Sequence, residues 1–213
     1  MTDLIEQRYV SRRRPEGVEA RPLGWWGTLL LMAVLATTYA ALYFTYVYLR
    51  VSSVHWPPEG IDPPALGLAG LSAAALALSA LPVRLALRAE RAWALVGYRL
   101  ALVAAGALAT THAGLLLRDW ARVPFSVDEH AYASLYFVLP GFHLTLIAIG
   151  LLMALVLLAL SWHDEAGALL HIGTRSLTLY WYVTTVGGVG LLAVVYLVPH
   201  LWRVAIAPAG AGP

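Results

Sequence analysis

The chain has 213 residues, of which 60% are hydrophobic and only 12% are charged, and its formal net charge is +2. Soluble globular proteins are about 45–50% apolar and about 25% charged, so this composition excludes a soluble domain and indicates an integral membrane protein. The fourteen basic residues are all arginines and show no patch of the kind that binds nucleic acid. Cysteine is absent, which excludes thiolate metal sites, disulfides and catalytic thiols.

Five apolar stretches are long enough to cross a membrane, since a transmembrane helix needs about 20 residues. They cover about 24–49, 64–84, 95–117, 133–160 and 177–201. No alternation of period two runs through them, which argues against a transmembrane barrel. The fold class is therefore predicted to be all-α: a polytopic membrane protein built as a bundle of five transmembrane helices.

The distribution of arginine predicts how this bundle is oriented. Ten of the fourteen arginines fall on one side, namely Arg8, Arg12, Arg13, Arg14, Arg21, Arg84, Arg88, Arg91, Arg99 and Arg175. The positive-inside rule then places the N-terminus in the cytoplasm and the C-terminus outside. We expect an Arg-containing cytoplasmic tail over 1–23, a membrane domain over 24–202 and a short outer tail over 203–213. The polar start predicts no cleavable signal peptide.

Ionisable groups are expected to be scarce inside the spans. All twelve carboxylates fall outside the limits given above. Ion pumps, proton relays and most coupled transporters place such groups at membrane depth, and many transporters also carry paired broken helices that this sequence lacks. A transporter or a proton pump is therefore disfavoured.

Two histidines do lie within the spans: His112 near the outer end of the third, and His143 two to three turns into the fourth. Histidines on facing helices can ligate a haem b, as in quinone-linked membrane anchors. Their expected depths match poorly, so a hydrogen bond between helices is the favoured role for His143. His163, Asp164, Glu165 and His171 are expected to form a solvated cytoplasmic loop. No catalytic, cofactor-binding or metal-binding residue is predicted.

Four segments, in chain order, carry a family resemblance. They are Trp25-Trp26-Gly27 leading through Tyr46-Val47-Tyr48-Leu49-Arg50 to Trp56-Pro57-Pro58-Glu59-Gly60, then Asp119-Trp120, then Tyr132-Ala133-Ser134-Leu135-Tyr136-Phe137 with Gly141-Phe142-His143, and finally Tyr180-Trp181. Over roughly 24–202 the set resembles subunit III of the haem–copper oxidases, such as cytochrome c oxidase, in its five-helix form. This resemblance independently implies a cytoplasmic N-terminus and an outer C-terminus.

The sequence also departs from the family pattern. The family's glutamate in the first of these helices is replaced by Leu35, or by Ala36 if the register slips by one. Leu146 stands where the family has a second histidine after Gly-Phe-His. Tyr182 replaces the histidine of the family's Tyr-Trp-His, and Thr185 replaces the aspartate that follows it. A buried carboxylate is costly without its partners, so the joint loss indicates a divergent member that discarded the whole polar cluster.

The resemblance implies an accessory, non-catalytic subunit of an oxygen-reducing terminal oxidase in a prokaryotic cytoplasmic membrane. It implies partners in subunit I, extended or fused, and subunit II, which would hold the haem and copper, and contacts with membrane lipids. Candidate lipid or interface residues are Trp25, Trp26, Arg50, Trp56 and His143, and candidate helix-packing residues are Gly67 and Gly70. The alternatives are a subunit-III-like partner of a nitric oxide reductase, a haem b quinone-reactive anchor using His112 and His143, and an assembly factor. The electron donor, cytochrome c or quinol, stays open.

Overall fold

The computed structural model describes residues 23–163 and 167–201, so the tails over 1–23 and 203–213 lie almost entirely outside the described residues. The elements are α2 (Leu23–Ser52), α3 (Leu66–Arg91), α4 (Leu95–Trp120), α5 (Ala131–Leu160) and α6 (Gly167–Leu192), followed by a short π-helix η2 (Ala193–Leu197). The described part of the chain contains no strand. Five helices, the last one continuing to Leu201, are long and apolar enough to cross a membrane. The predicted all-α, multi-pass bundle is confirmed.

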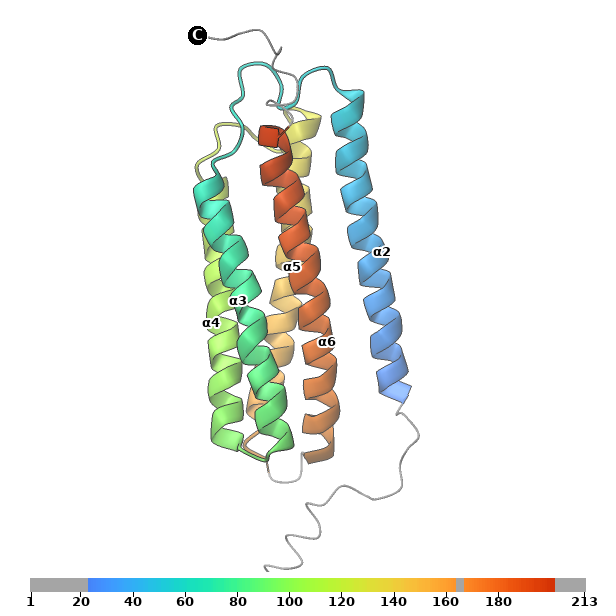
Figure 1. Cartoon of the computed structure of the whole chain (residues 1–213), viewed down its shortest axis with the longest axis vertical. Coiled ribbons are helices and arrows are strands. Elements are labelled where there is room, and N and C mark those ends of the chain that lie inside the picture. Colours follow the sequence, from blue (N-terminus) through green and yellow to red (C-terminus); the bar gives the residue numbers. More distant parts are fainter. Residues whose placement is uncertain (1–22, 164–166, 202–213) are drawn as a thin grey trace, which may run out of the picture.

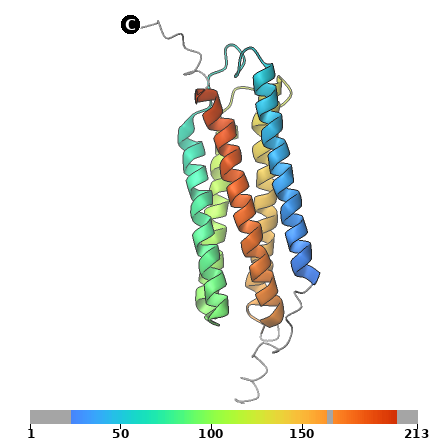
Figure 2. The ribbon, with the colours of Figure 1, turned by 45° about the vertical axis from the view of Figure 1, so that its right-hand side comes forward.

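The five helices run alternately up and down, as Figure 1 shows. Helix α6 lies centrally and contacts α2, α3 and α5, whereas the most extensive pairing joins α3 to α4. Figures 1 and 2 agree that α2 lies on the far side of α6 from the α3–α4 pair. Helix α2 is therefore attached to the bundle mainly through α6. We call the end at which α2 stops and α3 begins in Figure 1 the upper end of the bundle.

Helix α6 begins at Gly167, ten residues before the start that hydropathy predicts. Its first turns contain polar side chains that find partners on neighbouring helices. Thr174 Oγ1 lies 2.9 Å from the hydroxyl of Tyr98 on α4, and Ser176 Oγ lies 3.0 Å from Thr28 Oγ1 on α2. Because these groups are hydrogen-bonded inside the bundle, a polar sequence continues the helix there.

The core consists of two clusters of buried side chains, one of which reaches the upper end and the other the lower end. In the first cluster, aromatic side chains such as Tyr46, Tyr132, Tyr136 and Tyr196 pack together. In the second cluster, alanines of α3 and α4 allow these two helices to approach closely and cover Trp181. Small residues at helix contacts are typical of membrane bundles, where close backbone approach provides packing energy.

Candidate functional site

A polar layer crosses the upper half of the bundle, with one residue from each of four helices. This histidine layer consists of Tyr39 on α2, Ser72 on α3, His112 on α4 and His143 on α5. The imidazole rings of His112 and His143 are fully buried, and their centroids lie 5.2 Å apart in edge-to-face contact. Nδ1 of His112 lies 2.8 Å from Ser72 Oγ, and Nδ1 of His143 lies 2.8 Å from the Tyr39 hydroxyl.

The contact between the two histidines corrects the prediction that their depths match poorly. Helix α4 continues to Trp120, three residues beyond its predicted end, and this places His112 deeper in the bundle. The predicted role of His143 in a hydrogen bond between helices agrees with its contact to Tyr39.

Two glycines of α6 make room for this layer. A Cβ atom on Gly188 would overlap the imidazole of His143, and one on Gly187 would overlap the ring of Tyr39. Nε2 is among the His143 atoms nearest to Gly188. The glycine pair therefore lets α6 pack directly against the residues of α2 and α5 that carry the polar contacts.

A second polar layer lies nearer the upper end and is centred on a buried carboxylate. Asp119 is only 7% exposed, and its Oδ2 atom accepts hydrogen bonds from the hydroxyls of Tyr136 on α5 and of Tyr196 in η2, the latter at 2.6 Å. Both tyrosines are fully buried. A buried carboxylate requires donors of this kind because desolvation would otherwise disfavour its charge. We call Asp119, Tyr136 and Tyr196 the aspartate layer.

The two layers are related by a spacing of seven residues. His112 precedes Asp119 by seven residues on α4, and His143 comes seven residues after Tyr136 on α5. Seven residues make about two helical turns, or about 10.5 Å, so each pair shares one helix face. Leu116 and Leu139, which lie between the layers on these faces, are fully buried. Apolar side chains therefore separate the two layers.

Trp56 belongs to the core beside the aspartate layer. Its Nε1 donates to the Tyr46 hydroxyl at 3.1 Å, and its ring packs edge-on against Tyr46 and Tyr132. Only 6% of the residue is exposed. A side chain so enclosed has a packing role within this chain, and its predicted contact with lipid stays a prediction.

The other candidate interface residues differ in exposure. Arg50 is also buried, with 6% exposed. Trp25 is half-covered, because the guanidinium of Arg175 lies 4.7 Å from the centre of its ring. Trp26 is 54% exposed on the surface of α2. Of the predicted lipid residues, Trp26 therefore presents the largest surface outside the chain.

Gly67 and Gly70, predicted to pack against a neighbouring helix, lie exposed in the first turns of α3. A Cβ atom at either position would meet nothing within 4 Å. Neither glycine is required for packing within the described chain, and their role at an interface with another subunit stays a prediction.

A third polar contact joins α3 to α6 near the lower end. Glu90 is 6% exposed, and its Oε1 lies 2.9 Å from Nδ1 of His171. This corrects two predictions. His171 lies in α6 rather than in a loop, and two carboxylates, Glu90 and Asp119, are buried within membrane-length helices. Both lie beyond the predicted span limits. These limits are too short because hydropathy takes no account of the hydrogen-bond partners that allow a carboxylate to be buried.

The exposed loop between α4 and α5, at the upper end of the bundle, carries further acidic contacts. Ser126 donates from its hydroxyl to Asp128 at 2.7 Å and from its N–H to Glu129 at 2.8 Å. The hydroxyl of Ser126 holds the pKa of Asp128 below its ordinary value. Asp164 and Glu165 lie outside the described residues, and no group of three or more His, Asp or Glu able to hold a metal occurs among those described.

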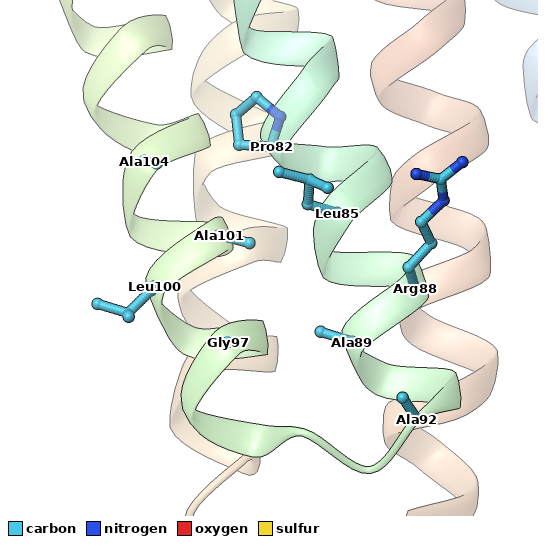
Figure 3. A pocket seen from close by; sticks show the side chains of 9 residues that line it. All are labelled: Pro82, Leu85, Arg88, Ala89, Ala92, Gly97, Leu100, Ala101 and Ala104. Carbon is cyan, nitrogen blue, oxygen red and sulfur yellow. The ribbon is translucent and has the colours of Figure 1, made fainter.

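An open groove lies between the lower halves of α3 and α4, where Figure 3 shows its lining residues. Its volume is about 590 Å³. Apart from Arg88, its lining is apolar and includes Pro82, Gly97 and Ala101. The guanidinium of Arg88 is directed away from α4 in this view. The groove thus brings no polar groups together, and the candidate site consists of the buried polar layers.

The histidine layer does not fit a haem b. A bis-histidine haem needs its porphyrin plane between the two ligating rings. The rings of His112 and His143 instead touch each other, and the backbone of α6 at Gly188 packs against the second ring. The arrangement leaves no layer for a porphyrin.

The family positions at which polar residues are missing lie beside this layer. Leu35 and Leu146 are buried at 8% and 6% exposure, one turn from Tyr39 and His143 respectively, and Thr185 is buried on α6. The family's polar cluster is absent at these positions, as the sequence indicates, but the bundle interior is not apolar there. Neutral hydrogen-bonding groups occupy the region in which the family pattern places a carboxylate.

Sequence reasoning missed Tyr39, Ser72, Tyr136, Tyr196 and the burial of Asp119. One signal was present in the sequence: the pairs Tyr39 and Tyr46, His112 and Asp119, and Tyr136 and His143 are each seven residues apart. In three neighbouring apolar helices, this repeat indicates two polar layers on the bundle-facing side.

The chain is similar to two curated proteins of the same name. It is 24% identical over 177 residues to cytochrome c oxidase subunit 3 of Lumbricus terrestris, which covers 80% of this chain and 68% of the relative. It is 24% identical over 179 residues to cytochrome c oxidase subunit 3 of Synechocystis, which covers 82% of this chain and 76% of the relative. No family model matches the chain. The protein is therefore a multi-pass membrane protein that resembles cytochrome c oxidase subunit 3 at low identity.

Proposed function

We propose that this chain is a non-catalytic subunit III of a haem–copper terminal oxidase that reduces oxygen in aerobic respiration. The main support for this proposal is the similarity to two cytochrome c oxidase subunit 3 proteins over at least 80% of the chain. The partners are subunit I, extended or fused, and subunit II, which hold the haem and copper. This chain binds neither. The complex lies in a prokaryotic cytoplasmic membrane, with the N-terminus of this chain inside.

The internal contacts support a structural role. In the histidine and aspartate layers, polar side chains from different helices bond to one another, as Tyr39 does with His143 and Tyr196 with Asp119. Such contacts fix the relative positions of the helices and leave the outer faces apolar. Exposed apolar side chains on α2 and α3, such as Phe44 and Leu71, are suited to contacts with lipid or with subunit I.

Purification from native membranes in mild detergent, followed by mass spectrometry, tests this function. The expected result is stoichiometric recovery with haem–copper subunits I and II. Recovery with the subunits of a nitric oxide reductase would show that the chain belongs to that complex instead. Recovery alone, or with an iron–sulfur or quinone enzyme, would refute the oxidase assignment, and absence from the mature complex would indicate an assembly factor.

The substitution His143→Ala tests whether the chain acts through its structure alone. We expect it to weaken attachment to the complex, because the contact that joins α5 to α2 through Tyr39 is lost. The haem absorption spectrum of the complex should not change. A shifted spectrum would contradict the assignment of the haem to partner subunits.

A further inference from the structure

Three buried polar atoms in the middle of the bundle have no hydrogen-bond partner among the described residues. They are Nε2 of His112, Nε2 of His143 and Oγ1 of Thr185. Both histidines are fully buried and Thr185 is 7% exposed. Buried polar groups are nearly always hydrogen-bonded, because leaving one unpaired incurs its full desolvation penalty. Each of these three atoms therefore calls for a partner that the described side chains do not supply.

The hydrogen-bonding capacity of His112 is set by its contacts. Its Nδ1 lies 3.1 Å from the backbone carbonyl oxygen of Ser72, which can only accept, so Nδ1 carries the proton. The Ser72 hydroxyl in turn donates to the carbonyl oxygen of His112 at 3.1 Å. Nε2 of a neutral His112 is therefore a bare acceptor.

His143 has the complementary capacity. When the Tyr39 hydroxyl donates to its Nδ1, Nε2 carries the proton and is a donor. This Nε2 edge of the ring lies against the backbone of α6 at Gly188. Thr185 is three residues earlier in α6, one turn away on the same helix face. Thus an acceptor on α4, a donor on α5 and a hydroxyl on α6 that can do either are buried on successive helices, because α5 packs against both α4 and α6.

We propose that these three atoms bind one buried water molecule. The water donates to Nε2 of His112, accepts from Nε2 of His143, and completes its coordination with the hydroxyl of Thr185. Three hydrogen bonds are typical of a buried water in a protein. With the water in place, one hydrogen-bonded network links all five helices, because Tyr39 and Ser72 add α2 and α3 to it.

The site is enclosed on both sides along the bundle axis. Leu116 and Leu139 lie one turn above the histidines, while Leu76 and Ile147 lie one turn below the layer, and all four are buried. The water can therefore exchange with the outside only when the helices separate locally, and it is a structural component of the fold rather than part of a conduction path.

A cryo-EM map of the purified complex, at a resolution that displays ordered waters, tests the site directly. The expected result is one density within hydrogen-bonding distance of both Nε2 atoms. Rings in contact with no such density would overturn the proposal, as would a stoichiometric metal in elemental analysis of the same preparation. The result is independent of which complex the chain belongs to, so it stands or fails separately from the proposed function.

The substitution Thr185→Val gives a second test with a matched control. It removes the hydroxyl at nearly constant shape, so we expect the Tm of the purified full chain to fall by about 2–4 °C, the shift that the loss of one such contact produces at this size. The control is Thr184→Val, because the Thr184 hydroxyl donates to the Tyr180 carbonyl of its own helix at 2.8 Å and should matter less. If Thr185→Val leaves Tm unchanged or raises it, Thr185 does not bind the water.

Discussion

At the scale of single residues, the buried group that depends most on hydrogen-bond partners is the carboxylate of Asp119. It is buried, and among the described contacts two tyrosine hydroxyls donate to the same oxygen. Hydrogen bonds to charged groups contribute more to stability than those between neutral groups. The stability of the upper end should therefore depend on these two hydroxyls more than on any neutral pair in the bundle.

The substitution Tyr196→Phe removes one of these donors without changing the shape of the ring. We expect the free energy of unfolding to fall by about 1.5–3 kcal/mol, the usual contribution of a hydrogen bond to a charged group. Thermal unfolding of the purified chain in detergent measures it. Tyr48→Phe is the control, since Tyr48 is 59% exposed. Equal effects of the two substitutions would show that Tyr196 does not stabilise Asp119.

Gly188 provides the closest approach of α6 to the histidine layer. In Gly188→Ala, the added methyl group would overlap the imidazole of His143, so α6 and α5 must separate. Overpacking of this kind costs about 1–3 kcal/mol in a well-packed core. Gly114→Ala on α4 is the control, because a Cβ there meets nothing within 4 Å. A neutral Gly188→Ala in thermal unfolding would contradict this close packing of α6 against α5.

At the scale of elements, the π-helix η2 determines where Tyr196 points. It comes just before Pro199, which cannot donate a backbone hydrogen bond and clashes with the carbonyl four residues earlier in an α-helix. The wider π turn holds one residue more than an α-helical turn. Tyr196 comes eight residues after Gly188 and would lie about 80° around a regular α-helix from it, and both residues are buried. The extra residue thus returns the helix to the register in which Tyr196 reaches Asp119.

Deletion of one residue tests this interpretation. Removal of Val194 from η2 should convert the π turn to an α-helix and keep the residues on both sides in place. Removal of Val186, which precedes Gly187 in regular helix, should rotate the rest of the helix by about 100° and break the contact of Tyr196 with Asp119. We expect the chain without Val194 to retain clearly more thermal stability. A reversed order would refute the register argument.

The elements also show what could be predicted from the sequence. Five helices could be predicted, because each contains a long, mainly apolar run without a carboxylate. The start of α6 could not be predicted, because the polar residues His171, Thr174 and Ser176 suggest a loop when their partners on other helices are unknown. Hydropathy measures each residue alone, whereas burial depends on partners such as Glu90, 81 residues from His171 in the sequence.

The candidate site was predictable only in part, for the same reason. The role of His143 could be inferred from its position in an apolar span, but its partner Tyr39 lies 104 residues away. The sequence places His112 too near the outer end because the predicted span ends at 117, although Asp119 beyond it is itself buried with Tyr136 and Tyr196. The sequence spacing of seven residues indicates the layers, but not which side chains bond.

At the scale of the whole molecule, the bundle has faces that its own packing leaves unused. Gly67 and Gly70 lie exposed on α3, and neither is needed within the described chain. Small residues at such positions allow a helix of another subunit to approach closely. Because both glycines are exposed, a substitution there should affect assembly with another subunit without affecting the stability of the chain itself.

The substitution Gly70→Leu should distinguish these two properties. We expect the Tm of the isolated chain to stay within about 2 °C of the parent, because surface changes usually alter stability by less than about 0.5 kcal/mol. Recovery of subunit I with the variant should fall, as measured by quantitative mass spectrometry after mild purification. Gly114→Leu on α4 is the control. Unchanged recovery with Gly70→Leu would place the interface elsewhere.

The attachment of α2 to α6 affects the order in which the protein can be built. Helix α2 is the first of the described helices to be synthesised, and α6, which holds its main contacts, is the last. The hydroxyl of Tyr43 on α2 donates to the carbonyl of Gly187, 144 residues later. At about 5–20 residues per second, this separation leaves α2 without its partner for about 7–30 s of translation. During that time Tyr43 lacks its acceptor on α6, so the first helix can take its final place only when the last one closes the bundle.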